Sequence, residues 1–298
     1  MELNGDGHID ILSGTYSRKS KDMAGLFQVL WGTKNGWKKA EVLNGTDGEP
    51  LILPQSQEAT DRICTRPFAV DYDGDGNLDI VAGNFNGTFG LFRGEGGGKF
   101  APKATWLEGR GGLLRVDSHG DPFFVDWDQD GDLDLISGSS QGGVYLFTNM
   151  GDRRNPKWSE RTTLMEAPGH QGYGSGSDSE DVVFGDAHCK APAADTRVWV
   201  DDVDGDGKLD LLVGDQSTLL HLGKGVAEAD AHKRLAVWQK KQQDFLKTPP
   251  GDSEEAQKKW REQYEALEKE RDEFAREEMT GFVWLLRQKA NGKTASGQ

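Results

Sequence analysis

The sequence has little cysteine and little proline, and it has no long apolar run. With only Cys64 and Cys189 among 298 residues, it cannot form a disulfide framework, although these two could still form one bridge. Ten prolines are too few for a proline-rich disordered chain. No segment approaches the roughly 18 consecutive apolar residues of a membrane-spanning helix. We therefore expect no membrane insertion.

Positive charge is also scarce. The chain has 35 Lys and Arg against 50 Asp and Glu, a formal net charge of −15. Because grip on a phosphate backbone depends on Lys and Arg, we expect no nucleic-acid partner. Glycine, in contrast, is abundant at 40 residues, about twice the usual share, which predicts many tight turns.

The N-terminus lacks a signal peptide, because Met1–Asp6 has neither a basic segment nor an apolar one. A repeated motif, described next, already begins at Glu2. We therefore expect the chain to start part-way into a longer protein, so the missing signal does not argue against export.

The chain repeats one acidic nine-residue motif four times, at residues 2–10, 71–79, 126–134 and 202–210. An apolar run that ends in Gly follows each copy, at residues 11–14, 80–83, 135–138 and 211–214. Aromatic-rich segments come later, at 25–31, 87–92, 143–147 and 281–286, and apolar segments precede three copies, at 68–70, 123–125 and 198–200. Such short segments are typical of β-strands. Three to four strands per repeat predict propeller blades or another radial β array.

The motif has the chemistry of a calcium loop. Positions 1, 3, 5 and 9 carry oxygen donors, and the Gly at position 6 permits a positive φ. Position 7 varies, as expected if it contributes only its backbone carbonyl. Oxygen ligands without Cys or His favour Ca²⁺. Carboxylates that converge in this way would repel one another without a cation between them.

An EF-hand is excluded, although its loop begins in the same way. Its twelfth position requires a bidentate Glu, whereas this chain has Ser13, Ala82, Ser137 and Val213 there. The flanking segments are strands rather than helices.

The pattern D-x-D-x-D-G-x-x-D, followed by an apolar strand and Gly, resembles the FG-GAP/VCBS repeat found in the β-propeller of integrin α subunits. The resemblance implies up to four Ca²⁺ ions, one in each loop between adjacent strands of a blade. By position, it implies side-chain ligands at Glu2, Asn4, Asp6, Asp10, Asp71, Asp73, Asp75, Asp79, Asp126, Asp128, Asp130, Asp134, Asp202, Asp204, Asp206 and Asp210. The backbone ligands would be those of His8, Asn77, Asp132 and Lys208. Glu2 departs from the pattern, so we expect the first site to be the weakest.

These observations predict an all-β fold: a β-propeller of about four blades with an inserted αα-hairpin. The blades would occupy residues 1–224 and 280–290, and either close a small ring or form part of a larger one. Residues 225–279 switch to helical periodicity, with Asp252 and Glu255 as a capping box for the second helix. The hairpin would either pack on itself or dock a partner. Residues 291–298 are expected to be a flexible tail, and 164–196 a long acidic loop around Gly172–Asp181.

No catalytic constellation is present in the sequence, so we predict a non-enzymatic protein with structural calcium. The first hypothesis is an extracellular, cell-surface or periplasmic interaction or adhesion module that binds a protein or glycan partner. The alternative is a lectin-like propeller or an accessory domain of a polysaccharide-active enzyme. Sugar stacking would need exposed aromatics, whereas we expect Trp31, Trp127, Trp199 and Trp284 to lie in the core.

The calcium hypothesis also accounts for the net charge. The four loops hold fifteen ligand carboxylates, three in the first loop and four in each of the others, which equals the formal excess of acids. The remainder of the chain is then formally neutral.

Overall fold

A computed structural model describes residues 1–298 except 19–22, 56–57, 168–183, 187–188 and 289–298. The predicted tail and Gly172–Asp181 lie outside the described residues. The chain divides into two compact units. The repeat unit comprises Met1–Ala167, Ala194–Gly214 and the chain from Val283, and the helical unit comprises Pro168–Ala193 and Asp215–Phe282. The described chain is mostly β, with several antiparallel sheets and two α-helices, as predicted.

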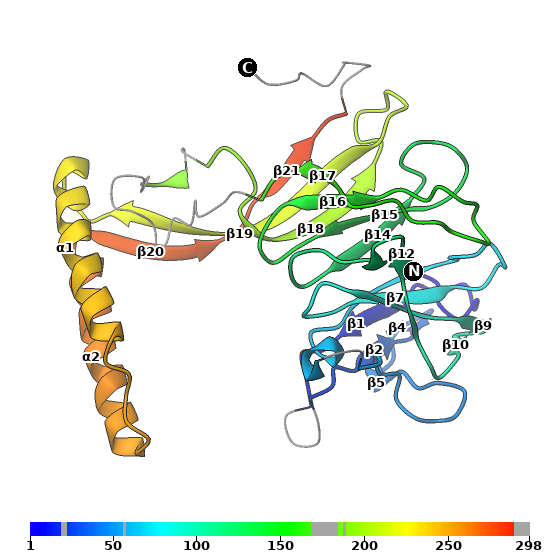
Figure 1. Ribbon diagram of the computed structural model, residues 1–298, viewed down its shortest axis with the longest axis horizontal. Helices are drawn as coiled ribbons and strands as arrows, with labels where there is room; N and C mark the ends of the chain where they lie inside the picture. Colours follow the sequence, from blue (N-terminus) through cyan, green and yellow to red (C-terminus); the bar gives the residue numbers. More distant parts are fainter. Residues whose placement is uncertain (19–22, 56–57, 168–183, 187–188, 289–298) are drawn as a thin grey trace. The chain divides into compact units, whose positions relative to one another are not determined.

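In the described part of the repeat unit, four sheets of three or more strands are present, one for each acidic motif (Figure 1). The first joins β1 (Ile11–Gly14), β2 (Phe27–Leu30) and β5 (Glu41–Val42). The second has the order β11 (Thr105–Trp106), β8 (Phe89–Phe92), β7 (Asp79–Gly83), β6 (Arg66–Val70). The third has the order β14 (Asp121–Val125), β15 (Asp134–Gly138), β16 (Val144–Phe147), β17 (Thr162–Met165). The fourth contains β18 (Ala194–Asp201), the residues of β19 (Asp210–Leu222) up to Gly214, and β21 (Val283–Leu286).

Shorter elements complete this unit. They are β3 (Gly32–Thr33), β4 (Gly36–Trp37), a 3₁₀ turn (Ala59–Arg62), β9 (Gly94–Gly96), β10 (Lys99–Phe100), β12 (Glu108–Gly109) and β13 (Gly112–Leu113). The apolar runs after the motifs all form strands, as do the segments before and beyond them. The strand prediction is therefore confirmed.

The core of the repeat unit lies between successive sheets. One buried cluster joins the first and second sheets around Phe27 and Phe92, whose rings meet edge to face. Another joins the second and third sheets around Phe89 and Phe147, and another joins the third and fourth around Ile136 and Val213. Strands β7, β8, β15 and β16 are buried along their whole length. Two covered faces explain why these strands are continuously apolar rather than alternating.

The glycines that end the apolar runs form the junctions between sheets. A Cβ built on Gly14 would lie 1.9 Å from the carbonyl oxygen of Thr65, at the start of the next sheet. On Gly83 it would lie 1.9 Å from the Gly120 oxygen, and on Gly138 it would lie 2.1 Å from that of Thr196. Only glycine allows the backbones to approach this closely. Hydroxyls then link the sheets: Thr65 Oγ1 accepts from the Thr15 amide at 3.0 Å, and Thr196 Oγ1 from the Ser139 amide at 2.9 Å.

The helical unit contains α1 (Glu228–Leu246), α2 (Glu254–Asp272), the remainder of β19 and β20 (Ala275–Thr280). Helices α1 and α2 pack together, and α2 contacts β20 (Figure 1). The buried Trp238 of α1 donates its indole N–H to the Leu267 carbonyl of α2 at 2.7 Å. The two predicted helices are thus present.

Three details of the sequence interpretation were wrong. Ser253, not Asp252, caps α2, since its side chain accepts the Ala256 amide. The helical hairpin was predicted to continue to residue 279, but residues 275–279 belong to β20, where they pair with β19. Trp199 is 57% exposed rather than in the core, with its ring edge-on to Phe123.

The sequence left the pairing of the two cysteines open, whereas it predicted no membrane-spanning segment. No disulfide joins Cys64 and Cys189. In the described part of the chain, neither helix has both the length and the apolar character needed to cross a membrane.

Candidate metal centres

Three of the acidic motifs are the loops between the first two strands of a sheet. Loop 2 (residues 71–79) joins β6 to β7, loop 3 (126–134) joins β14 to β15, and loop 4 (202–210) joins β18 to β19. Loop 1 (2–10) leads into β1. The predicted ligands therefore lie at the same end of each sheet.

The carboxylates at positions 1 and 5 fold each loop around themselves. In loop 3, Asp126 accepts the amides of Asp130 and Gly131 at 3.0 and 3.1 Å, and Asp130 accepts that of Asp132 at 3.1 Å. Loops 2 and 4 repeat this pattern of bonds. In loop 1, Glu2 accepts from Gly7, and Asp6 accepts from His8 at 2.9 Å. Each loop is thus shaped by its own acids.

Two positions of each loop need a left-handed backbone, although the sequence analysis identified only one. Position 6 is Gly throughout, with φ between 83° and 102°. Position 4 also has positive φ, between 63° and 75°. It is Gly in loops 1, 2 and 4 but Gln129 in loop 3. The glycines at position 4 of three loops could have predicted the positive φ at this second position.

Gln129→Gly should stabilise the protein by about 1 kcal/mol, because a side chain in the left-handed region costs roughly 1–2 kcal/mol. The change also removes a 3.3 Å hydrogen bond from Gln129 to the Gly207 carbonyl. Gln129→Ala isolates that loss, since it keeps the strained backbone. Gly205→Gln is the reciprocal control, with φ at 73° and open space around a Cβ. Urea unfolding would measure all three; a Gln129→Gly variant less stable than wild type would contradict the strain.

The aspartate at position 9 is the buried anchor of each loop, only 1–2% exposed. In loop 3, Asp134 accepts the amides of Trp127 at 3.0 Å and Asn149, beyond the loop, at 2.8 Å. Asp10 and Asp79 bind the equivalent pairs of amides. Among the described residues, Asp210 accepts the amide of Gln288 through Oδ1, and its buried Oδ2 has no hydrogen-bond partner there.

The structure brings three groups of carboxylates together within the described residues. Each group has ligand oxygens within 4.8 Å of one another: Asp71, Asp73 and Asp75; Asp126, Asp128 and Asp130; Asp202, Asp204 and Asp210. Position 9 thus joins the group only in loop 4, where Asp206 instead pairs with Lys208 at 2.8 Å. Over the same described residues, the acids of loop 1 form no group of this kind.

The loops differ in the positive charge beside them. In loop 2, Arg93 lies 2.8 Å from Asp73 and Arg153 lies 3.5 Å from Asp71. Loop 4 has Lys208 and, 3.4 Å from Asp204, Arg287. Within the part of the chain that the structure describes, no ion pair reaches the carboxylates of loop 3. Its negative charge is the least compensated.

Some of the negatively charged side chains of loop 3 are buried from solvent. Burial raises the pKa of Asp134 to about 6, against the opposing effect of its two amide donors. Burial also raises the pKa of Asp132, and the charges of Asp130, Asp128 and Asp126 add to this. Asp132 is only 8% exposed, and its Oδ1 has no hydrogen-bond partner. The sequence analysis assigned Asp132 only a backbone role, so this extra charge was missed.

Residues 71–136 match the model of the FG-GAP-like repeat family, which spans loops 2 and 3 and the strands between them. The chain therefore contains an FG-GAP-like repeat. The resemblance predicted from sequence is confirmed for this segment. Loops 1 and 4 carry the same motif outside the matched FG-GAP-like segment. A comparison with curated proteins found no match.

Proposed function

We propose that the chain is a calcium-binding β-propeller module that acts outside the cell as a non-enzymatic interaction or adhesion domain. The observation that carries the proposal is the same turn in loops 2, 3 and 4, each with three carboxylates whose oxygens lie within 4.8 Å. Repulsion among such groups is relieved by a divalent cation. Oxygen-only donors select Ca²⁺ over zinc or copper.

The donor set of loop 4 fits a cation in a second way. Asp210 is 2% exposed, and its Oδ2 has no hydrogen-bond partner in the part of the chain that the structure describes. Buried polar atoms are nearly always satisfied, and a bound Ca²⁺ would satisfy this one. Asp202, Asp204 and Asp210 would hold the ion there, and the positions 1, 3 and 5 acids would do so in loops 2 and 3. The ion would supply positive charge that stabilises the turns.

Calcium in these loops would be structural rather than catalytic. If Ca²⁺ binds the folded loops but not the unfolded chain, its binding free energy adds to the stability of the sheets. Loops of this kind suit the millimolar Ca²⁺ found outside cells. The repeated glycine junctions join four sheets in sequence order, which supports a radial array of blades. The partner, a protein or a glycan, stays a prediction.

Adding Ca²⁺ should raise the melting temperature by about 10 °C relative to EDTA. A site at one hundred times its Kd adds about 2.7 kcal/mol, and each kcal/mol shifts a domain of this size by about 2–4 °C. One such site would therefore give a shift of about 10 °C, and each further site would add to it. Differential scanning calorimetry in millimolar Ca²⁺, Mg²⁺ or EDTA measures it. Equal melting temperatures, with no calcium by elemental analysis, would refute the proposal.

Loop 3 should bind first, because no cation competes with the metal there. Trp127 at position 2 of loop 3 makes the site observable, since a nearby indole sensitises Tb³⁺ emission; the same position in loop 2 is Tyr72. Titration with Tb³⁺ under tryptophan excitation should give a first phase that Asp128→Ala abolishes. Trp127→Phe should remove the emission but leave calcium binding intact.

A further inference from the structure

A second cluster of charged residues lies at the other end of the repeat unit's first strands. The cluster contains Arg66 of β6, Asp121 of β14 and Arg197 of β18. Each of these residues lies five positions before the first residue of the loop that follows its strand. A strand of five residues spans about 17 Å, so this cluster is remote from the carboxylate groups of the loops. It is therefore a separate site from the metal centres.

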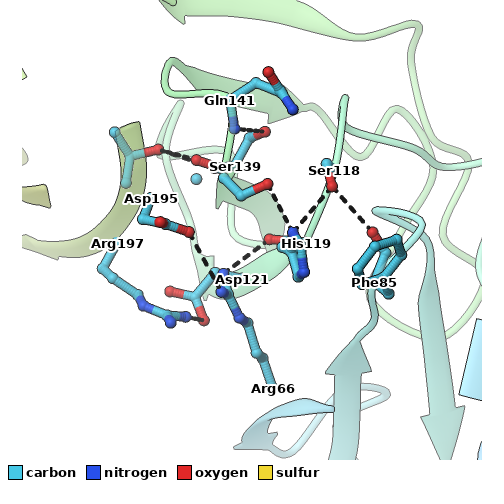
Figure 2. Close-up of polar contacts among 12 residues, drawn as sticks. Arg66, Phe85, Ser118, His119, Asp121, Ser139, Gln141, Asp195 and Arg197 are labelled. Carbon is cyan, nitrogen blue, oxygen red and sulfur yellow. Dashed lines mark hydrogen bonds and ion pairs between the residues drawn. The ribbon is translucent and has the colours of Figure 1, made fainter. Parts of the chain in front are cut away.

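The arginines of this cluster differ in how their charge is compensated (Figure 2). Arg197 donates to Asp121 at 2.8 Å. Arg66 is only 13% exposed; it donates to the backbone carbonyl of His119 at 3.0 Å, and the carboxylate of Asp195 is 3.8 Å away. No described carboxylate thus lies within hydrogen-bond distance of Arg66. Burial lowers the pKa of Arg66, and the charge of Arg197 lowers it further, against the opposing charges of Asp121 and Asp195. A buried cation in this setting favours an added anion.

Arg66 and Arg197 both line a cavity of about 400 Å³. Thr15, Tyr16 and Cys64 line it together with Arg66, Asp121 and Arg197. Its volume lies at the lower end of the range for small-molecule sites. The charged side chains that line it are two arginines and one aspartate, a net charge of +1, while Asp195, which pairs with Arg66 at 3.8 Å, lies outside this lining. A small polar ligand with one negative charge fits these properties.

The backbone around the cluster is held in an unfavourable conformation at three equivalent places. Cys64, His119 and Asp195, each seven residues before position 1, have φ of 56°, 48° and 48°. Side chains disfavour this region, so the surrounding contacts must impose it. His119 Nδ1, for example, lies 2.7 Å from Ser140 Oγ. It also lies 3.0 Å from Ser118 Oγ (Figure 2). The turn that precedes Arg66, Asp121 and Arg197 is thus preorganised.

We propose that Arg66 and Arg197 bind the carboxylate group of a small polar ligand in this cavity. The planar guanidinium fork matches the two oxygens of a carboxylate. Asp121, which pairs with Arg197, would repel a doubly charged phosphate more strongly than a carboxylate. The site does not depend on calcium, because it shares no residue with the loops.

Ligand-observed NMR with the full chain tests this proposal, using glucuronate as the probe, glucose as its uncharged counterpart and inorganic phosphate as the competing anion. We expect saturation transfer to glucuronate, little to glucose, and weak competition from phosphate. Arg197→Gln and Arg66→Gln should each weaken glucuronate binding at least tenfold. Arg154→Gln, which removes an exposed arginine elsewhere in the unit, should leave binding unchanged.

Three results would overturn the proposal: no transfer to glucuronate, equal transfer to glucose, or unchanged binding by Arg197→Gln. Stronger binding of phosphate would overturn the choice of carboxylate. Arg197 is half exposed, so its variant should fold even if Arg66→Gln does not. Binding should be the same in Ca²⁺ and in EDTA at a temperature where both forms are folded. The outcome is therefore distinguishable from a failure of the calcium proposal.

Discussion

Gly138→Ala should destabilise the repeat unit by about 3 kcal/mol or more, as expected for severe overpacking. The added Cβ would sit 2.1 Å from the carbonyl oxygen of Thr196 and 2.6 Å from its carbonyl carbon. Both are backbone atoms, so no rotamer change can relieve the clash. Separation of the third and fourth sheets would also disturb the bond from the Ser139 amide to Thr196 Oγ1. Urea unfolding followed by tryptophan fluorescence measures the loss.

Gly214→Ala is the matched control for this prediction. Gly214 ends the fourth apolar run as Gly138 ends the third, but the nearest atom to its Cβ would be Arg197 Cβ at 3.9 Å. That is ordinary van der Waals contact. We expect stability within about 0.5 kcal/mol of wild type, as for most harmless substitutions. If both variants lose the same amount of stability, the close backbone approach is not the reason that position 138 requires glycine.

Asp134→Ala should have a comparably large effect, and it should occur with or without calcium. The substitution leaves the buried amides of Trp127 and Asn149 without their acceptor. Hydrogen bonds to a charged group contribute about 1.5–3 kcal/mol each, so a loss of about 3 kcal/mol is expected. The hydrogen bond between loop 3 and Asn149, two residues after β16, would be lost together with a predicted calcium ligand.

Asp128→Ala separates the anchoring role from the metal role. Asp128 belongs to the carboxylate group of loop 3 but is not one of the buried anchors. In EDTA its removal should cost little and could relieve repulsion, whereas in Ca²⁺ it should lower stability. Melting temperatures of both variants in the two buffers decide the matter. An Asp134→Ala variant as stable as wild type in EDTA would contradict the anchoring role.

Most of the repeat architecture could be predicted from the sequence, because local spacing encodes it. The nine-residue motif and the apolar runs fixed the positions of four loops and the strands around them. Helical periodicity likewise located α1 and α2. It failed at residues 275–279, where pairing with β19 outweighs local preference. Asp252 and Ser253 are both good capping residues, and Ser253 is the cap because the helical backbone begins at Glu254.

The features missed from sequence depend on contacts between distant residues. The sequence shows that Gly83 and Gly138 end apolar runs, but glycine is required there because carbonyl groups of the next sheet lie so close. Arg66 and Arg197 are separated by more than a hundred positions, and they line one cavity only because each repeat starts its first strand there. Arg93, Arg153 and Arg287, beside loops 2 and 4, likewise come from other parts of the chain. A local motif cannot report such neighbours.

The glycine junctions have a consequence for how the repeat unit loses its structure. Each sheet meets the next through the same backbone contact, so its energy can be treated as an intrinsic contribution and a coupling to each neighbour. Such a linear chain of coupled elements is the condition under which the ends of an array fray before its middle. Weakening the contact at Gly83 or Gly138 would divide the array into two independently melting segments. Cooperativity in this protein thus depends on a few glycines, and each junction that is weakened should add one transition on heating.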